Sequence, residues 1–518
     1  MRKLSIIIIL QTILLNQIQA QREVVILPDS IGALNNAILG DTTATGERID
    51  ANTVYILKRN GIYKTTGEIQ NRGYTLTIKA ETGEGSMPFI QPTAPTGGES
   101  SRVFTAINDL VLDGIYLTNV DDFGRYLERM IRINADSITV TANNCWFDGA
   151  GQSLFRVDNT GTKIYLRNST ISHIGRTFVP NNGRVVDIRE NTDSVVVQNC
   201  TFYNVTSRLL RMSEGRYLTY AEFDQNTIMN LAQRCISFDQ SIIMKLTNNI
   251  FANPGFLGTS RNSEIIELED LPVQLIDLIQ QQGLTRQIDI GHNLFFTTEQ
   301  MQDYRDTLRD QPFYAGDLYD LLLEQPTGPD STQLVTDLTF TEPIRFENPP
   351  EVNRAVVEGM IFDQFFAENP DNGSAPNWDL FSSPFNLMVD RRLNIPWQKP
   401  YSFSFSPDSY AATAATDGGP LGDRNWNLKT FEIVLNTNPE IEKNAIVYPN
   451  PANGIIYLKL PPERVKNIRI LNISGQVIHS KENYFKNQVN IAQLPAGLYI
   501  IETIDTNNEE FRQKLIKQ

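Results

Sequence analysis

Two short patterns of apolar and polar residues alternate along residues 110–300, and each returns at a regular spacing. In the first, a polar residue stands three positions before a Phe or Ile, as in NCWF (144–147), NSTI (168–171), NCTF (199–202), QNTI (225–228), NNIF (248–251) and NLFF (293–296). The second is an apolar–polar–apolar triplet centred on Arg132, Arg156, Asp187, Arg211, Ser237 and Glu267. Such local alternation of β-branched and aromatic residues is typical of short strands. Each copy therefore predicts one strand.

The distance between the two patterns predicts how these strands are stacked. Arg132 and Asn144 are 12 residues apart, and so are Asn144 and Arg156, which makes a repeat of 24 residues. Two repeats carry 7 extra residues, before Asp187 and before Glu267. Coils of this length that each add a short strand to every sheet form a parallel β-helix. The expected fold class is all-β, with a right-handed parallel β-helix as the body of the protein.

Stacked coils place equivalent residues in columns, so the interior can be predicted. One apolar column should contain Phe147, Ile171, Phe202, Ile228, Phe251 and Phe296. The polar residues at 144, 168, 199, 225 and 248 should form an Asn-rich ladder, whose amides bond to the coils above and below. Cys145 and Cys200 fall one position after this ladder, and Cys235 has no partner at CxxC spacing. We therefore interpret the cysteines as buried packing residues rather than a disulfide framework or a zinc site.

The residues before position 110 predict the beginning of the same solenoid. Residues 30–41 are expected to form a short helix with Ser30 as N-cap and Gly40 as C-cap. Such a helix would cover the exposed end of the stack, which every solenoid must protect. Residues 54–57 and 74–78 are expected to be strands of the first coils.

The capping helix that ends in Gly40-Asp41, the strands after it and the later coils resemble the pectate-lyase-like β-helix superfamily. The IR, FR and LR strands and the segment NCTFYNV (199–205) are most similar to secreted β-helix proteins of Bacteroidetes, a group related to chondroitinase-B-like polysaccharide lyases. The resemblance covers roughly residues 24–300. It implies the fold and leaves the activity open.

Residues 443–518 have a different pattern, in which strands alternate with Gly and Pro turns, and this predicts a small immunoglobulin-like β-sandwich. The motifs YPNP (448–451), ISGQ (473–476) and LPAGLY (494–499) resemble the type A sorting domain of type IX secretion. The resemblance implies interaction with the type IX secretion machinery, export across the outer membrane, and a secreted or cell-surface location. Residues 301–442 lack the repeat and are expected to be irregular excursions and a closing segment packed on the solenoid.

The N-terminus predicts a secretory signal peptide over residues 1–20, with cleavage after Ala20. Arg2 and Lys3 supply the positive start, and residues 6–15 are largely apolar. This apolar run is too short to span a membrane and no second candidate follows it, so the mature chain is expected to contain no transmembrane segment. The β-helix with its capping helix then occupies residues 21–300.

The charge pattern points to a candidate binding surface. The formal net charge is −15, which disfavours a general nucleic-acid binder. On this acidic chain, the strand alignment nevertheless places seven Arg in two adjacent outward columns. Like charges on rungs about 4.8 Å apart repel, so the columns cost stability unless something neutralises them. The first column contains Arg129, Ser153, Arg184, Arg208, Arg234 and Glu264, and the second contains Arg132, Arg156, Asp187, Arg211, Ser237 and Glu267.

Two interpretations account for the arginine columns. In the first, they line a groove for an acidic polysaccharide, whose carboxylate or sulfate groups are gripped by guanidinium forks. In the second, the ladder neutralises itself, because Asp187 lies between Arg156 and Arg211 and further carboxylates are close in sequence. These are Glu128, Asp158, Glu190 and Glu214.

The sequence leaves open whether the protein is an enzyme. A polysaccharide lyase acting by β-elimination must stabilise the charge on the substrate carboxylate and remove the neighbouring proton. Arg suits the first task but is a poor base, and neither column contains a Lys. The alternative is a non-catalytic surface protein that binds glycan or mediates adhesion through the same face. No cofactor is expected; the weak calcium candidates Glu264, Glu267, Glu269 and Asp270 also fit an exposed acidic turn.

Overall fold

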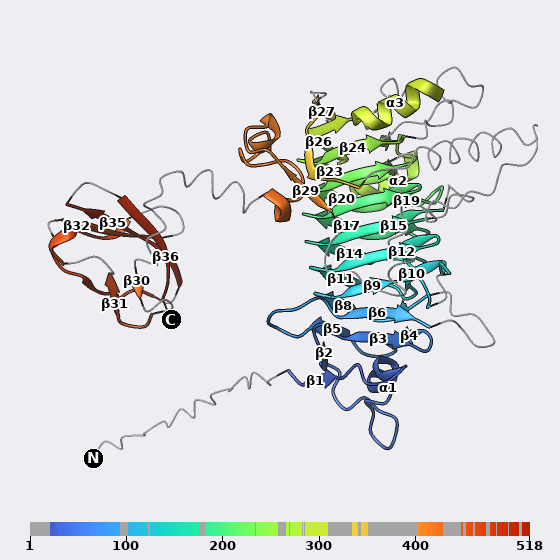
Figure 1. Cartoon of the computed structure of the whole chain (residues 1–518), viewed down its shortest axis with the longest axis horizontal. Helices are drawn as coiled ribbons and strands as arrows, with labels where there is room; N and C mark the ends of the chain where they lie inside the picture. Colours follow the sequence, from blue (N-terminus) through green and yellow to red (C-terminus); the bar gives the residue numbers. More distant parts are fainter. Residues whose placement is uncertain are drawn as a thin grey trace, which may run out of the picture. The chain divides into compact units, whose positions relative to one another are not determined.

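Each turn of the chain adds strands to two parallel sheets that wind around a common interior in the computed structural model (Figure 1). The structure describes residues 21–93, 102–122, 125–175, 182–233, 235–256, 266–268, 270–281, 283, 285–308, 334–339, 343–350, 401–427, 447–448, 452–458, 462–472, 477–482, 484–495, 497–506 and 510–517. The predicted signal peptide, residues 1–20, lies outside this set. The chain divides into two compact units, Met1–Phe431 and Glu432–Gln518.

The eight-stranded sheet of the first unit takes one strand from each turn, and all neighbours in it are parallel. Its members in spatial order are β4 (Ile69–Gln70), β7 (Phe104–Ala106), β10 (Arg129–Ile133), β13 (Ser153–Val157), β16 (Arg184–Ile188), β19 (Arg208–Met212), β22 (Ile236–Asp239) and β25 (Ile266–Leu268).

The 19-stranded sheet consists of two rows of stacked strands that share β26. The long row is β1 (Glu23–Ile26), β2 (Val54–Leu57), β5 (Leu76–Ala80), β8 (Leu110–Asp113), β11 (Thr139–Asn143), β14 (Thr162–Arg167), β17 (Thr192–Gln198), β20 (Leu218–Asp224), β23 (Ser241–Thr247), β26 (Gln287–Phe296) and β27 (Leu334–Thr339). The short row is β3 (Ile62–Thr65), β6 (Phe89–Pro92), β9 (Tyr116–Thr118), β12 (Trp146–Ala150), β15 (Thr170–Ile174), β18 (Thr201–Val205), β21 (Thr227–Leu231), β24 (Ile250–Pro254) and the end of β26. This arrangement confirms the predicted all-β parallel solenoid.

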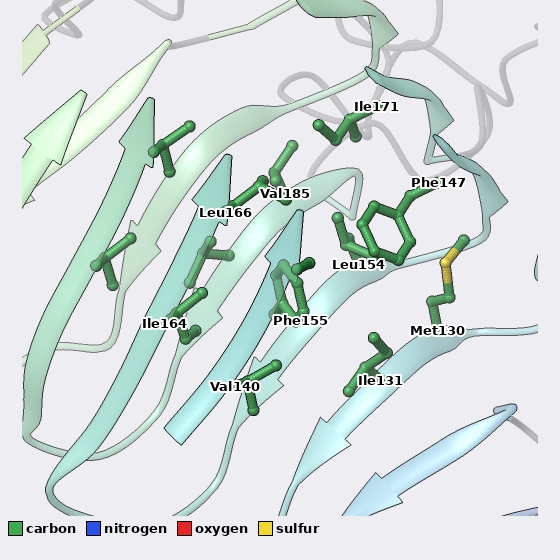
Figure 2. Packing of buried hydrophobic residues seen from close by; sticks show 14 of the residues in the cluster. Met130, Ile131, Val140, Phe147, Leu154, Phe155, Ile164, Leu166, Ile171 and Val185 are labelled. Atoms are coloured by element: carbon green, nitrogen blue, oxygen red, sulfur yellow. The ribbon is translucent and has the colours of Figure 1, made fainter. Parts of the chain in front are cut away.

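The interior is a continuous stack of apolar side chains from all three rows of strands, as Figure 2 shows around Phe147 and Phe155. The predicted apolar column is present in register. Phe147 lies opposite Ile171, which is followed by Phe202, Ile228 and Phe251 on successive rungs. Because each turn buries side chains only against its neighbours, the core extends with the number of turns.

The last residue of this column differs from the prediction. Phe251 pairs with Phe295 rather than Phe296, and the two rings stack at 4.5 Å. Phe296 packs in a second apolar cluster outside the solenoid interior. The reason is that His292 takes the positive-φ position of the ladder, φ 53°, which the spacing had assigned to Asn293.

The predicted Asn-rich ladder is present. Asn144, Asn168, Asn199, Gln225 and Asn248 all have φ between 50° and 60°, a left-handed conformation that Asn tolerates better than most residues. The side-chain amide of Asn199 donates to the amide oxygen of Asn168 at 2.7 Å. Cys145 and Cys200 are free and buried one position later, as expected.

A second amide ladder, not predicted above, follows five positions after the first. Asn204, Asn230 and Asn253 have φ of 58°, 57° and 54°. Asn253 donates to Asn230 at 2.8 Å, and Asn230 donates to Asn204 at 3.1 Å. The constant offset of five residues from Asn199, Gln225 and Asn248 was a usable signal in the sequence.

A short helix, α1 (Ala33–Leu39), packs against the first strands, and its C-cap is Gly40 as predicted. Its N-cap is Gly32, with φ 81°, rather than Ser30. The difference arises because the first helical hydrogen bond runs from the amide of Asn36 to the carbonyl of Gly32, so the helix begins two residues later than predicted.

Later segments pack on the outside of the solenoid. These are α2 (Val273–Gln281), α3 (Glu299–Leu308), the antiparallel pair β28 (Phe346–Asn348) and β29 (Ser402–Phe405), and a 3-10 turn at Tyr410–Ala412. The Asp423 carboxylate accepts a hydrogen bond from Thr201 at 2.6 Å, and the Arg424 amide donates to Asn199 at 2.7 Å. This segment therefore donates to one acceptor of the ladder, at Asn199, and accepts from the neighbouring Thr201 hydroxyl.

The second unit is a small antiparallel β-sandwich. One sheet contains β30 (Val447–Tyr448), β31 (Ile455–Leu458) and β34 (Gln488–Asn490); the other contains β33 (Val477–Glu482), β32 (Val465–Asn472), β35 (Gly497–Asp505) and β36 (Glu510–Lys517), with a 3-10 turn at Pro462–Arg464. Ile456, Ile468 and Val489, from both sheets, share one buried cluster. In the described part of the whole chain, no helix has the length and apolar character needed to cross a membrane.

The corrected register at the end of the ladder predicts unequal effects at two neighbouring residues. Asn293 is buried, accepts from the amide nitrogen and side chain of Asn249 at 3.0 and 2.8 Å, and donates to Leu246 at 2.7 Å. Asn293→Ala should therefore cost about 2–3 kcal/mol of unfolding free energy. His292→Asn should cost less than about 1 kcal/mol, because an exposed Asn suits the positive φ. Urea denaturation measures both, and a larger loss in His292→Asn would contradict the register.

Candidate functional site

The eight-stranded sheet carries the two arginine columns on its outer face. Arg129, Ser153, Arg184 and Arg208 are in register in the first column, and Arg132, Arg156, Asp187 and Arg211 are in register in the second. We call this surface the arginine face. The register confirms the alignment made from the spacing; Arg234 lies outside the described residues.

Two consecutive buried residues separate the columns on each rung. Met130 and Ile131 both point into the interior, as do Leu154 and Phe155 on the next rung (Figure 2). The strand register omits Met130 and Leu154 at this point, which marks a local irregularity in the pairing. Residues three positions apart can therefore share the outer face, although a regular strand would alternate them.

Two buried or half-buried carboxylates hold five arginines of this surface. Asp158 accepts from Nε of Arg132 at 2.5 Å and from Nε of Arg156 at 2.8 Å. Asp187, whose side chain is 3% exposed, lies 3.4 Å from Arg184, 3.0 Å from Arg189 and 3.3 Å from Arg211. The single carboxylate of Asp187 therefore forms ion pairs with three guanidinium groups.

Two further arginines have a carboxylate each. Arg208 pairs with Glu267 at 3.0 Å, and Glu267 also accepts from Ser237. Arg129 pairs with Glu128 at 3.0 Å, but the Glu128 side chain is 43% exposed, so that this pair is weak. Taken together, these ion pairs of described residues join seven guanidinium groups to four carboxylates. The self-neutralising interpretation accounts for part of the positive charge and leaves an excess.

Burial and, to a smaller extent, neighbouring positive charges lower the pKa of two of these arginines. Burial lowers the pKa of Arg184 to about 10; Asp187 opposes this effect, and the positive charges of Arg211, Arg189 and Arg208 add to it. Burial and the charge of Arg156 likewise lower the pKa of Arg129. For Asp158, burial raises the pKa, but the hydrogen bonds from Arg156 and Arg132 outweigh it and hold the pKa below its usual value. In the ion pairs named above, guanidinium groups outnumber carboxylates.

Several polar atoms of the first column are buried. Among them, Nε of Arg129, Oγ of Ser153 and Nε of Arg184 have no hydrogen-bond partner in the described part of the chain. Ser153 is 1% exposed. A buried polar atom without a partner costs free energy, so these atoms add to the cost of the arginine face.

A polar pocket of about 340 Å³ lies at one end of the arginine face. Its walls combine the arginines of β19 with acidic residues and with the turn that follows β19. The lining residues are Arg208, Arg211, Met212, Ser213, Glu214, Gly215, Arg216, Asp239, Gln240 and Glu267. A volume of this order accommodates a small ligand or one unit of a longer one.

A third column, missed from the sequence, balances the second. Asp158 follows the end of β13 and lies two positions after Arg156. Arg189 follows the end of β16 and lies two positions after Asp187. The charges are exchanged between the two rungs: Arg-x-Asp is followed by Asp-x-Arg. Because residues two apart share a face, this exchange was a readable signal for Arg189, which the sequence analysis did not include.

No Lys or His occupies either column within the described residues. Lys163 is exposed on β14, in the long row. His173 is fully buried on β15, where its Nδ1 lies 2.7 Å from Asp148, and burial lowers its pKa to about 3. His173 is therefore neutral and has no access to a ligand on the arginine face.

The acidic turn considered for calcium is only partly described. Glu264 and Glu269 lie outside the described residues, and Glu267 is engaged by Arg208 and Ser237. Across the portion of the chain that the structure describes, no three His, Cys, Asp or Glu side chains gather as a metal site would require.

Comparison with known proteins identifies the second unit. Residues 446–518 match the family described as "Secretion system C-terminal sorting domain". The β-sandwich is a sorting domain. A sorting domain of this kind implies secretion or a cell-surface location and an interaction with the secretion machinery.

The comparisons say less about the solenoid. No curated protein matches the chain. A solved structure of a PL6 family alginate lyase, AlyGC, matches with 15% sequence identity and a TM-score of 0.32, over 54% of this chain and 40% of that protein. The chain therefore spans well under two thirds of the length of that lyase.

The shared carboxylate predicts an asymmetric effect on stability. Asp187→Asn should lower the unfolding free energy by about 3 kcal/mol, because three half-buried guanidinium groups lose their common partner. Arg184→Gln is the matched variant and should change stability little, since Asp187 keeps Arg189 and Arg211. Urea denaturation compares them, and equal stability of Asp187→Asn and the unaltered chain would show that Asp187 does not organise the face.

The sorting domain predicts the fate of a truncated chain. In a host with the matching secretion system, removal of residues 446–518 should leave the protein inside the cell. The full chain should reach the surface or the medium. Immunodetection on intact cells, in the medium and in lysates distinguishes the two, and export of the truncated chain would contradict the prediction.

Proposed function

We propose that the exported protein binds an acidic polysaccharide along its arginine face without cleaving it. The observation that carries this proposal is the excess of guanidinium groups on one outer face, where seven arginines share four carboxylates. Anionic groups of a ligand would supply the missing negative charge.

The arginines are suited to such a ligand because they are ordered before it arrives. Asp158 and Asp187 fix five of them through hydrogen bonds or ion pairs, so little side-chain entropy remains to be lost on binding. Guanidinium groups donate through several N–H groups in a planar fork, which suits carboxylate and sulfate. Their repetition along the solenoid axis favours a polymer over a single small anion.

A polysaccharide lyase is the second candidate, and one observation favours it. Burial lowers the pKa of Arg184 to about 10, so that a small neutral fraction of this group could accept a proton. At pH 7 about one molecule in a thousand would have the neutral form. Catalysis by this group would therefore increase about tenfold for each pH unit up to pH 10.

The binding proposal predicts a loss of affinity that depends on position rather than on total charge. The double variant Arg129→Gln/Arg184→Gln should weaken binding to acidic polysaccharide roughly a hundredfold, because two charge-assisted hydrogen bonds are lost. Neither change strands a buried carboxylate, since Glu128 is exposed and Asp187 keeps two other partners. Affinity of the full chain should also fall as salt is added.

Lys79→Gln/Lys163→Gln is the control, because it removes the same charge from the long row of strands. Affinity is measured calorimetrically with alginate, pectate, hyaluronan and chondroitin. Equal losses in the two double variants would reject the arginine face as the binding surface. The same mixtures are followed for ultraviolet absorbance of an unsaturated product from pH 7 to 10. Absorbance that rises with pH and disappears in Arg184→Gln would establish the lyase instead.

A further inference from the structure

The four-stranded sheet of the sorting domain has a long edge that no described strand covers. The strand order of this sheet is β33-β32-β35-β36, and β33 pairs with β32 alone. Five of the six residues of β33 are exposed. Because successive side chains of a strand point to opposite faces, both faces of β33 are open to solvent. An open edge of this kind presents backbone N–H and C=O groups to an approaching strand.

The other edges of the sandwich are shorter or partly covered. β30 and β34, the outer strands of the three-stranded sheet, contain two and three residues. The outer edge of β36 receives an isolated bridge from Ala452 at Lys517, and Nζ of Lys517 donates to Asn453 at 3.1 Å. Short or covered edges are how proteins prevent the addition of a further strand. Within the described part of the domain, β33 is therefore the edge best able to accept one.

A β-bulge lies at the apolar end of β33. In the register with β32, the partner of Leu471 is Val477. The partner of the preceding Ile470 is His479, so that Ile478 is an additional residue on the edge strand. Val477 and Ile478 are 51% and 42% exposed. Two adjacent apolar side chains are thus available to a partner at this end of the edge.

Phe485 supplies a second apolar side chain near the opposite end of β33. Its amide donates to the carbonyl of Val465, the first residue of β32, at 2.9 Å. Its φ is 44°, a left-handed conformation in which a bulky residue is an outlier. The side chain is 50% exposed, so packing does not explain why a Phe rather than a Gly has this conformation. Residues strained in this way are concentrated at binding sites.

We propose that β33 is the surface through which the sorting domain docks on the secretion machinery, and that its partner is an extended segment of a protein of that machinery. The segment adds to the sheet as a strand beside β33. Its apolar side chains contact Val477 and Ile478 at one end and Phe485 at the other. Between these ends, Lys481 and Glu482 favour polar residues in the partner.

The length of β33 fits such a partner. Six residues of strand span about 20 Å, which a short linear segment covers. The inference rests on the family match of the sorting domain and is independent of the arginine face. A failure of one proposal therefore leaves the other unaffected.

The test compares two isoleucines of nearly equal exposure in the full chain. Ile478→Lys, at 42% exposure on β33, should reduce the amount exported in a fixed time about tenfold, because one strong interface contact is lost. Ile455→Lys, at 40% exposure on β31 in the other sheet, is the control and should be exported normally. Immunodetection on intact cells, in the medium and in lysates of a host with the matching secretion system measures export. Equal export of the two variants would overturn the proposal.

Phe485→Gly separates docking from folding. Gly adopts a φ of 44° without crowding, so this variant should melt at the same temperature as the unaltered chain or higher. Its export should nevertheless fall several-fold, because the second apolar contact is lost. This variant also decides the matter if a thermal melting curve shows that Ile478→Lys does not fold. Normal export of Phe485→Gly would overturn the docking role of this end of the edge.

The mass of the purified full chain in solution distinguishes the proposed partner from a second copy of the protein. Light scattering should report a monomer for the unaltered chain and for Ile478→Lys. A dimer that Ile478→Lys dissociates would show that β33 pairs with its own equivalent, and this result would overturn a segment of the secretion machinery as the partner.

Discussion

The in-register stacking of parallel rungs is the constraint on which this structure depends. Rungs about 4.8 Å apart place each side chain against its equivalents above and below. Apolar columns such as Phe147, Ile171 and Phe202 gain from this repetition, because like residues pack on like. Amide columns gain as well, because each Asn side chain can donate to the Asn of the preceding coil and accept from that of the following coil. Columns of like charge are instead destabilised by repulsion between rungs, and the arginine face contains such columns.

The face reduces the repulsion by sharing and exchanging carboxylates. Asp158 lies between Arg132 and Arg156, and Asp187 replaces an arginine in the second column while Arg189 takes the acidic place beside it. The result is an ordered surface whose positive charge is lowered but not removed. A structure that needed only stability would have used neutral residues here, since replacing half-buried ion pairs by apolar residues is often neutral or favourable. The proposal of an anionic ligand rests on this retained excess.

The segments packed on the outside of the solenoid form hydrogen bonds with polar groups at and beside the amide ladder. Asn199 accepts from the amide of Arg424, and Thr201 donates to Asp423, although more than two hundred residues separate them in the chain. Hydrogen bonds of this kind satisfy acceptors at the edge of a solenoid without adding another turn. The arginine face lies on the other sheet, so this closure and the candidate binding surface use different sides of the fold.

The sequence by itself determined the parts of the structure that repeat. The 12-residue spacing predicted the strands, the main ladder and the alignment of Arg132 with Arg156, because a stacked rung has no freedom to place equivalent residues elsewhere. The motifs of the tail likewise predicted the sorting domain. At the end of the stack the spacing misassigned His292 and Asn293, since a one-residue shift changes which side chain faces the core. Only the tertiary structure decided how Asp187 is divided among three arginines and which atoms of Ser153 and Arg184 are left without partners. Long side chains turn toward partners from several rungs, and their directions depend on contacts that a one-dimensional repeat does not contain.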